Sequence, residues 1–388
     1  MSKTRAPFIP RRRLPRPRLV SRPAPGGALP FDRRSFLGSL LAGAALAAVG
    51  CDKDDPPAAT TPSSRGVSIA EVRAGEDLFG YVVRVRGGHD EALYKAILGA
   101  ANEYKEGDEA LGIHALDQAT RDNARALLGN TRLGDLRAHP LHRDAVLALI
   151  EGAVDEGAAA RVAGWTMAEL REFLLREDEP AIKAVMVGLS SEIIGMIVKL
   201  MTNDELIAVS RKVFNPLPGS NIGARGYLGA RIQPNSPTDN VDDIVWQVFS
   251  GWSYAVGDVV LGNNPVSSEV DSVAAIELAL KDVLVTFGLQ DTLPHCVLAH
   301  IDVQAAAEGE YPGSTALWFQ SLGSTDDANA TFDVSVDKML AHAAQRGGKF
   351  GLYFETGQGA DATNGHGAGF DMVVHEARKY GFARALTG

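Results

Sequence analysis

Several side chains able to bind ligands or transfer protons follow short apolar runs in the second half of the chain. They are Arg231, Gln233, Asn264, His300, Asp302, Gln320, Ser321 and Glu355. Arginine donates hydrogen bonds, carboxylates accept them and amides do both, so Arg231, Gln233, Asn264 and Glu355 suit a small ligand with an amine and a hydroxyl. Any one of them could instead be a solvated loop residue. Their shared position at the ends of apolar runs makes the group a candidate site.

A divalent metal ion is the competing interpretation of the same region. His300 and Asp302 are two residues apart, and Glu355, Asp361 and His366 supply further ligand types found in metal-dependent hydrolases. This spacing is generic, so we expect no metal site. The sequence also lacks the glycine-rich signatures of dinucleotide-binding and phosphate-binding loops.

The apolar runs must position these side chains, and their alternation with longer helical stretches predicts parallel β/α units from residue 221 onward. The runs cover residues 226–234, 258–266, 295–302, 317–323 and 350–359. Each run ends in polar residues. In a β/α barrel the C-terminal ends of the strands share one face, and that face carries the site.

The first half of the chain has helical patterns from about residue 68 to about residue 215. Apolar residues recur every three or four positions in 91–104 and 190–201, as in amphipathic helices. Ser/Thr-x-x-Glu spacing, typical of a capped helix start, occurs at SIAE (68–71), TMAE (166–169) and TNDE (202–205). We therefore expect a helical region over 68–220 and the β/α units over 221–388.

The charge of the chain is unevenly distributed. The net charge of the 388 residues is −10, but residues 1–50 contain ten Lys and Arg and one acid, so the remainder carries −19. An acidic body is a poor partner for nucleic acid, and we expect none.

The basic N-terminus is typical of an export signal. Arg33 and Arg34 precede a 16-residue apolar stretch, 35–50, which is short for a membrane span and is followed by Cys51. The paired arginines indicate a twin-arginine signal, and AVGC resembles a lipoprotein box. We therefore expect residues 1–51 to be a signal with lipidation at Cys51, and 52–67 to be a flexible linker. This predicts an exported protein, periplasmic or anchored to the membrane through its lipid.

Longer motifs resemble the large subunit of ethanolamine ammonia-lyase. They run in order from about Gly75 to about Ala385: GEDLFGYVVRVRGG, LGAANEYKEGDEALGI, MTNDELI, ARIQPNSPTD, GDVVLGNNPV, CVLAHIDVQ, FQSLGST and YFETGQG. The resemblance implies a helical N-terminal region followed by an eight-stranded β/α (TIM-type) barrel. It also implies adenosylcobalamin-dependent radical conversion of ethanolamine to acetaldehyde and ammonia, a small-subunit partner and a homo-oligomer of large subunits.

The resemblance also implies roles for individual residues. Arg231, Gln233, Asn264 and Glu355 match substrate-binding positions of the family, and we assign Glu355 and Arg231 the central catalytic roles. Pro265, Gln320 and Thr363 match contacts to the cobalamin, and Ser321 lies beside the adenosyl group.

The chain departs from the family in three respects. By comparison with the family, strands six to eight are missing after Gly388, so we expect an incomplete barrel of about five β/α units and impaired activity. Thr331 stands where the family places an acidic residue. An export signal is unexpected, because the family works in the cytoplasm or in bacterial microcompartments. An exported amine-binding lipoprotein and an inactive remnant therefore remain the alternatives.

Overall fold

A computed structural model describes residues 66–217, 221–227, 229–257, 259–347, 349–356 and 366–387. Two compact units were distinguished, Met1–Thr60 and Thr61–Gly388, and the described residues belong to the second. The predicted signal, Cys51, Asp361 and Thr363 lie outside the described residues. No helix within the described ranges has the length and hydrophobicity to cross a membrane.

Short helices form the first part of the described chain. They are α2 (Leu78–Arg86), α3 (Glu91–Ala100), α4 (Glu106–Ala110), α5 (Gln118–Asn130), α6 (Leu133–Ala138), α7 (Ala145–Gly152), α8 (Glu156–Val162), α9 (Met167–Arg176), α10 (Glu179–Met186), α11 (Ser191–Val198) and α12 (Asn203–Ser210). Aspartate side chains accept hydrogen bonds from the first turns of α2, α3, α5, α7, α8 and α10, where a negative charge also offsets the helix dipole.

Two of the three predicted helix starts are confirmed. Thr166 with Glu169, and Thr202 with Glu205, form complete capping boxes at α9 and α12. The prediction at residues 68–71 was wrong. Val67 pairs with Ala115 in a parallel bridge, residues 68–71 form no helix, and the first helix begins only at α2.

The second part of the chain alternates strands with helices. The strands are β1 (Ala230–Ile232), β2 (Val259–Asn263), β3 (His295–Val297), β4 (Trp318–Leu322) and β5 (Leu352–Thr356). The helices are α13 (Val241–Trp252), α14 (Val270–Thr286), α15 (Ile301–Glu310), α16 (Asp326–Ala330), α17 (Val336–Ala344) and α19 (Met372–Thr387). Each strand lies within a predicted run.

All strand pairs are parallel, as predicted. β1, β2 and β3 form one sheet, and β4 and β5 form another. The backbone N–H of Leu317 donates to the carbonyl of His295 at 3.2 Å, which joins the start of β4 to the start of β3. The predicted fold class is therefore confirmed: a helical region is followed by parallel β/α units arranged as a partial α/β barrel.

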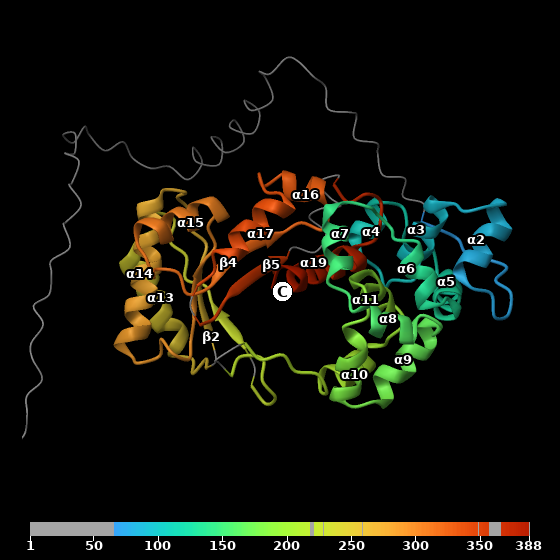
Figure 1. Cartoon of the computed structure of the whole chain (residues 1–388), viewed down its shortest axis with the longest axis horizontal. Helices are drawn as coiled ribbons and strands as arrows, with labels where there is room; N and C mark the ends of the chain where they lie inside the picture. Colours follow the sequence, from blue (N-terminus) through green and yellow to red (C-terminus); the bar gives the residue numbers. More distant parts are fainter. Residues whose placement is uncertain are drawn as a thin grey trace, which may run out of the picture. The chain divides into compact units, whose positions relative to one another are not determined.

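The two faces of the strands pack against different partners. On the outer face, Val259, Leu261 and Val297 are buried against residues of α13, α14 and α15. Figure 1 shows these helices lying along one side of the strands. On the inner face, alternate residues form a second apolar cluster, which consists of Val260, Cys296, Leu317, Phe319 and Phe350 with Tyr353 packed against it. The strand alternation therefore separates a helix-covered outer face from an inner face that holds the candidate site.

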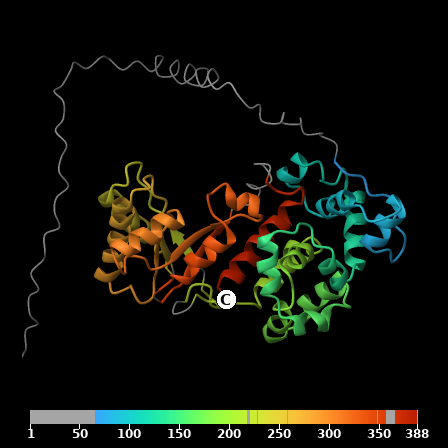
Figure 2. The same ribbon diagram turned by 45° about the horizontal axis from the view of Figure 1, so that its top comes forward.

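The last helix of the chain packs against the helical region. α19 lies beside α7 and α11 in both ribbon views (Figures 1 and 2). The buried guanidinium of Arg378 bonds the carboxylate of Glu192 at 2.8 Å and that of Asp144 at 2.6 Å. Polar contacts thus fix the β/α units to the helical region.

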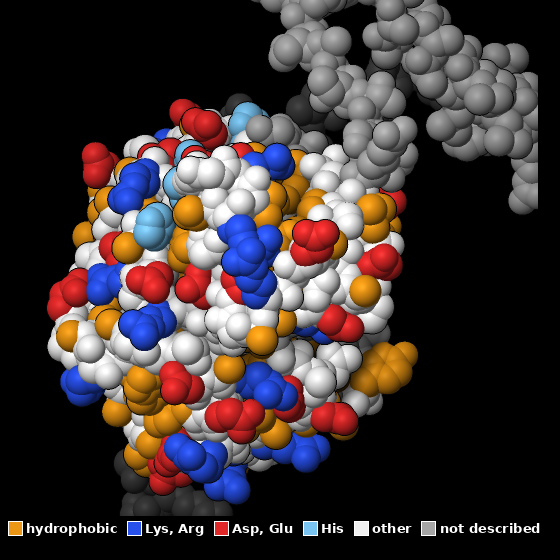
Figure 3. Space-filling view, turned by 90° about the vertical axis from the view of Figure 1, so that its right-hand side faces the viewer, with side chains coloured by type: hydrophobic (Ala, Val, Ile, Leu, Met, Phe, Trp, Pro, Cys, Tyr) orange, Lys and Arg blue, Asp and Glu red, His pale blue; other side chains and the backbone are white. Residues whose placement is uncertain are grey.

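One surface of the helical region carries acidic and basic side chains interspersed with each other (Figure 3).

Candidate functional site

The centre of the candidate site is a contact between the first and the fifth strand. Arg231 of β1 forms an ion pair with Oε1 of Glu355 in β5. The same guanidinium donates from Nη1 to the hydroxyl of Tyr353 at 3.0 Å, and its Cζ lies 5.5 Å from the centre of the Tyr353 ring. The prediction that Arg231 and Glu355 share one face is therefore confirmed.

A glycine in β2, which has no side chain, allows Arg231 to reach across the sheet. Gly262 lies under the guanidinium, and a Cβ atom at this position would be 2.9 Å from Cζ of Arg231 and closer still to Nε. Such distances are shorter than real Cβ contacts. The side chain of Arg231 can therefore pass over β2 at this point because residue 262 is glycine.

The amide of Asn264 belongs to the same cluster. Nη2 of Arg231 lies 3.3 Å from Oδ1 of Asn264, and the backbone N–H of Asn264 donates to the side chain of Asn235 at 3.1 Å. Gln233 is exposed two residues beyond Arg231, and Pro265 is half-buried beside Asn264. The positions of Arg231, Gln233, Asn264 and Pro265 therefore lie at the C-terminal ends of β1 and β2, where the sequence predicted them.

The two candidate residues on β4 point in opposite directions. Ser321 is exposed and is the register partner of Glu355, so it lies beside the cluster. Gln320 is completely buried on the outer face, where its amide nitrogen donates to the carbonyl of Met339 at 2.9 Å and lies 2.8 Å from Nδ1 of His342. Burial lowers the pKa of His342 to about 4, so this histidine is neutral near pH 7. The structure brings Ser321, but not the side chain of Gln320, to the cluster.

His300 and Asp302, two residues of the metal alternative, are engaged elsewhere. Nε2 of His300 lies 2.9 Å from the carbonyl of Phe332, and Asp302 accepts from Lys338 at 2.7 Å. Among the described residues, which do not include Asp361, no three His, Cys, Asp or Glu side chains are grouped closely enough to hold a metal ion.

Tyr353 is a member of the cluster that the sequence interpretation missed. Its hydroxyl donates to Oε1 of Glu355 at 3.3 Å while it accepts from Arg231. The signal that identifies it is spacing, because residues two apart in a strand share a face and Tyr353 precedes Glu355 by two.

The cluster rests on the apolar inner side of the strands. The rings of Phe319 and Tyr353 lie 6.3 Å apart, and Cys296 and Val260 are buried beneath them. Burial raises the pKa of the Cys296 thiol well above its usual value, so this thiol is inert near neutral pH. Side chains on an apolar floor are less screened by water, which strengthens the attraction of Arg231 and Glu355 for polar ligand groups.

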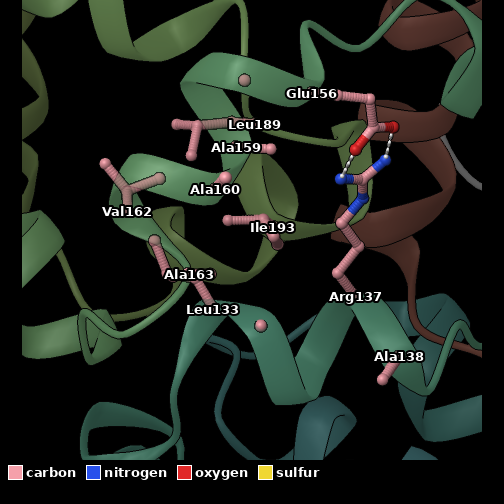
Figure 4. A pocket seen from close by; sticks show the side chains of 12 residues that line it. Leu133, Arg137, Ala138, Glu156, Ala159, Ala160, Val162, Ala163, Leu189 and Ile193 are labelled. Atoms are coloured by element: carbon pink, nitrogen blue, oxygen red, sulfur yellow. Dashed lines mark hydrogen bonds and ion pairs between the residues drawn. The ribbon is translucent and has the colours of Figure 1, made fainter.

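A separate hollow of about 360 Å³ lies within the helical region (Figure 4). Its walls are mainly alanine and leucine side chains. Both Nη atoms of Arg137 donate to Glu156, at 2.8 and 2.6 Å, and its Nε donates to Glu151 at 2.9 Å. Because the guanidinium of Arg137 is already engaged by these carboxylates, the hollow offers a ligand few free binding groups, and the strand-end cluster is the better candidate.

Comparisons with known proteins agree with this arrangement. The family model described as "Ethanolamine ammonia lyase large subunit (EutB)" matches residues 91–388, which include the five strands of the described residues. The ethanolamine ammonia-lyase large subunits of Escherichia coli (strain K12) and Salmonella typhimurium (strain LT2) are each 34% identical to the chain over 307 residues. The matches cover 75% of this chain and 66% of each relative. The chain therefore belongs to the ethanolamine ammonia-lyase large-subunit family.

Proposed function

We propose that the chain acts as an ethanolamine ammonia-lyase large subunit, which binds ethanolamine and converts it to acetaldehyde and ammonia with adenosylcobalamin. The observation that carries the proposal is the contact of Arg231 with Glu355 across the strand ends, with Asn264 beside them. The chain spans 66% of the length of the relatives named above, so their whole activity is a proposal here. A small subunit and further copies of the chain are the proposed partners.

The cluster offers complementary groups to the two ends of ethanolamine. Arg231 and Tyr353 both contact Oε1 of Glu355, so Oε2 is left to accept hydrogen bonds from the ammonium group. The guanidinium of Arg231 and the amides of Asn264 and Gln233 would donate to the hydroxyl. Holding both ends orients the carbon chain between them, which restricts the paths open to a reactive intermediate.

The described residues fit adenosylcobalamin in part. Ser321 and Pro265 lie at the same strand ends as the substrate cluster, where they would contact the cofactor, whereas Gln320 can offer only its backbone because its side chain is buried behind β4. Thr363 is proposed as a further contact from the resemblance alone. The cofactor supplies radical chemistry when bound, and the chain supplies binding, orientation and exclusion of water.

We further propose that the protein is exported through its paired arginines and anchored through Cys51. The support is the order of Arg33, Arg34, the apolar stretch and Cys51 in the sequence. A strand-end site on an exported body would act on amines outside the cytoplasm.

The test is acetaldehyde formation by the purified full chain. Ethanolamine and adenosylcobalamin are supplied with and without a small subunit, and acetaldehyde is followed through the oxidation of NADH by alcohol dehydrogenase. Acetaldehyde that requires both the cofactor and the chain supports the proposal. Ethanolamine binding without acetaldehyde under any of these conditions would favour the amine-binding lipoprotein, and the absence of both would favour the inactive remnant.

A further inference from the structure

The hydroxyl of Tyr353 lies between the two charged groups of the cluster. It accepts a hydrogen bond from Nη1 of Arg231 at 3.0 Å and lies 3.3 Å from Oε1 of Glu355. A phenol can accept and donate at the same time, so one hydroxyl can orient both partners.

Arg231 depends on such contacts for its position. The side chain leaves β1, crosses Gly262 and ends over β5, and its buried Nε has no hydrogen-bond partner among the described residues. Among the described residues, its guanidinium is held at the far end alone, by Glu355, Tyr353 and Asn264. Tyr353 contributes twice, through its hydroxyl and through its ring.

Glu355 is oriented from the same side. The contacts from Arg231 and Tyr353 both reach Oε1. The carboxylate can rotate about its terminal bond, and two contacts on one oxygen oppose that rotation. Oε2 is thereby held in the position that faces away from them.

We propose that Tyr353 is a positioning residue of the ethanolamine site, whose hydroxyl fixes Arg231 relative to Glu355 and keeps Oε2 of Glu355 available to the ammonium group. This proposal rests on the proposed function. It assigns Tyr353 an indirect role, because the hydroxyl acts on the ligand through the guanidinium and the carboxylate. The ring adds the apolar floor on which both charges lie, through its packing against Phe319.

The experiment is calorimetric titration of the full chain with ethanolamine. Tyr353→Phe keeps the ring and removes the hydroxyl, so we expect an unchanged melting temperature and about tenfold weaker binding, as for one hydrogen bond to charged groups. The exposed Tyr254 supplies the matched control, since Tyr254→Phe should leave the affinity unchanged.

A double-mutant cycle separates positioning from other roles. Arg231→Lys keeps the charge but loses the fork that contacts Tyr353. In this background we expect Tyr353→Phe to weaken binding clearly less than tenfold, because the hydroxyl no longer has a guanidinium to hold and keeps only its contact with Glu355.

The possible outcomes distinguish this proposal from the one on which it rests. Binding by wild type with equal affinity in Tyr353→Phe would overturn the positioning role alone. The same tenfold loss in both backgrounds would also overturn it, because the hydroxyl would then act independently of Arg231. Absence of ethanolamine binding by wild type would overturn the proposed function, and the positioning role with it.

Discussion

Lys199 and Asp371 form an ion pair in which both side chains are completely buried. Lys199 follows α11, and Asp371 precedes α19 and accepts from the backbone N–H groups of Val373 and Val374. Burial opposes the charged form of Asp371, but Lys199 and a hydrogen bond from Asn102 outweigh it, so the pKa of Asp371 lies below its usual value. Burial lowers the pKa of Lys199, an effect that Asp371 partly offsets. The pair fixes the start of α19 to the helical region.

Lys199→Met should strongly destabilise the fold. It leaves the carboxylate of Asp371 buried without its counter-charge, which costs about 3–5 kcal/mol of unfolding free energy. Urea denaturation measures the loss. The control is Lys338→Met, which breaks the exposed ion pair with Asp302 and should leave the stability nearly unchanged. Equal effects of the two substitutions would contradict a structural role for the buried pair.

Gly262→Ala should weaken ethanolamine binding without unfolding the protein. The new methyl group would displace the guanidinium of Arg231 from the strand ends, and we expect a loss of about tenfold or more, comparable to removing a charged hydrogen bond. Gly257→Ala is the matched control, since nothing lies within 4 Å of a Cβ atom there. If calorimetry gave both variants the wild-type affinity, the passage of Arg231 over β2 would not be required for ethanolamine binding.

His342 should make the stability depend on pH. Its pKa is lowered to about 4 by burial, against an ordinary value of 6.5, so the folded state favours the neutral ring. The corresponding stability is complete above pH 6.5 and is lost as the pH falls toward 4, by up to about 3 kcal/mol. Urea denaturation between pH 7 and pH 4 measures the slope. His342→Asn removes the titrating ring and should flatten it; the same slope in both proteins would exclude His342 as its source.

Replacing Arg33 and Arg34 together by lysine should retain the protein in the cytoplasm, because twin-arginine signals depend on the paired guanidinium groups. Fractionation of cells that express the wild type and the double variant measures this. The control is Arg22→Lys, which lies outside the pair and should be exported normally. Export of the double variant would contradict the proposed route.

Much of the fold could be predicted because its signals are local. Each strand is a short apolar run with a polar end, and the capping boxes at Thr166 and Thr202 use residues three positions apart. The same spacing at Ser68 predicted a helix start wrongly, because a local pattern does not show that Val67 pairs with the distant Ala115. The family resemblance, carried by long motifs, is confirmed by the match over residues 91–388.

The sequence could predict only those members of the candidate site whose location follows from their position in a strand. Arg231 and Glu355 follow from strand ends, but the contact of Arg231 with Tyr353 depends on how the sheet that contains β1 lies against the sheet that contains β5, which no local pattern gives. Adjacent strand residues face opposite sides, so the side chains of Gln320 and Ser321 could not both face the cluster. The structure shows that Ser321 is the one that does.

The most direct test of the account is calorimetric titration of wild type and Glu355→Gln with ethanolamine. The substitution preserves the shape of the side chain and removes the charge that would receive the ammonium group. We predict wild-type binding and a loss of about 1.5–3 kcal/mol in Glu355→Gln, as expected for a charge-assisted hydrogen bond. Glu310→Gln, at the exposed end of α15, should bind as wild type does. Equal affinities of wild type and Glu355→Gln would contradict the account, because Glu355 would then be a solvated residue at the end of a strand.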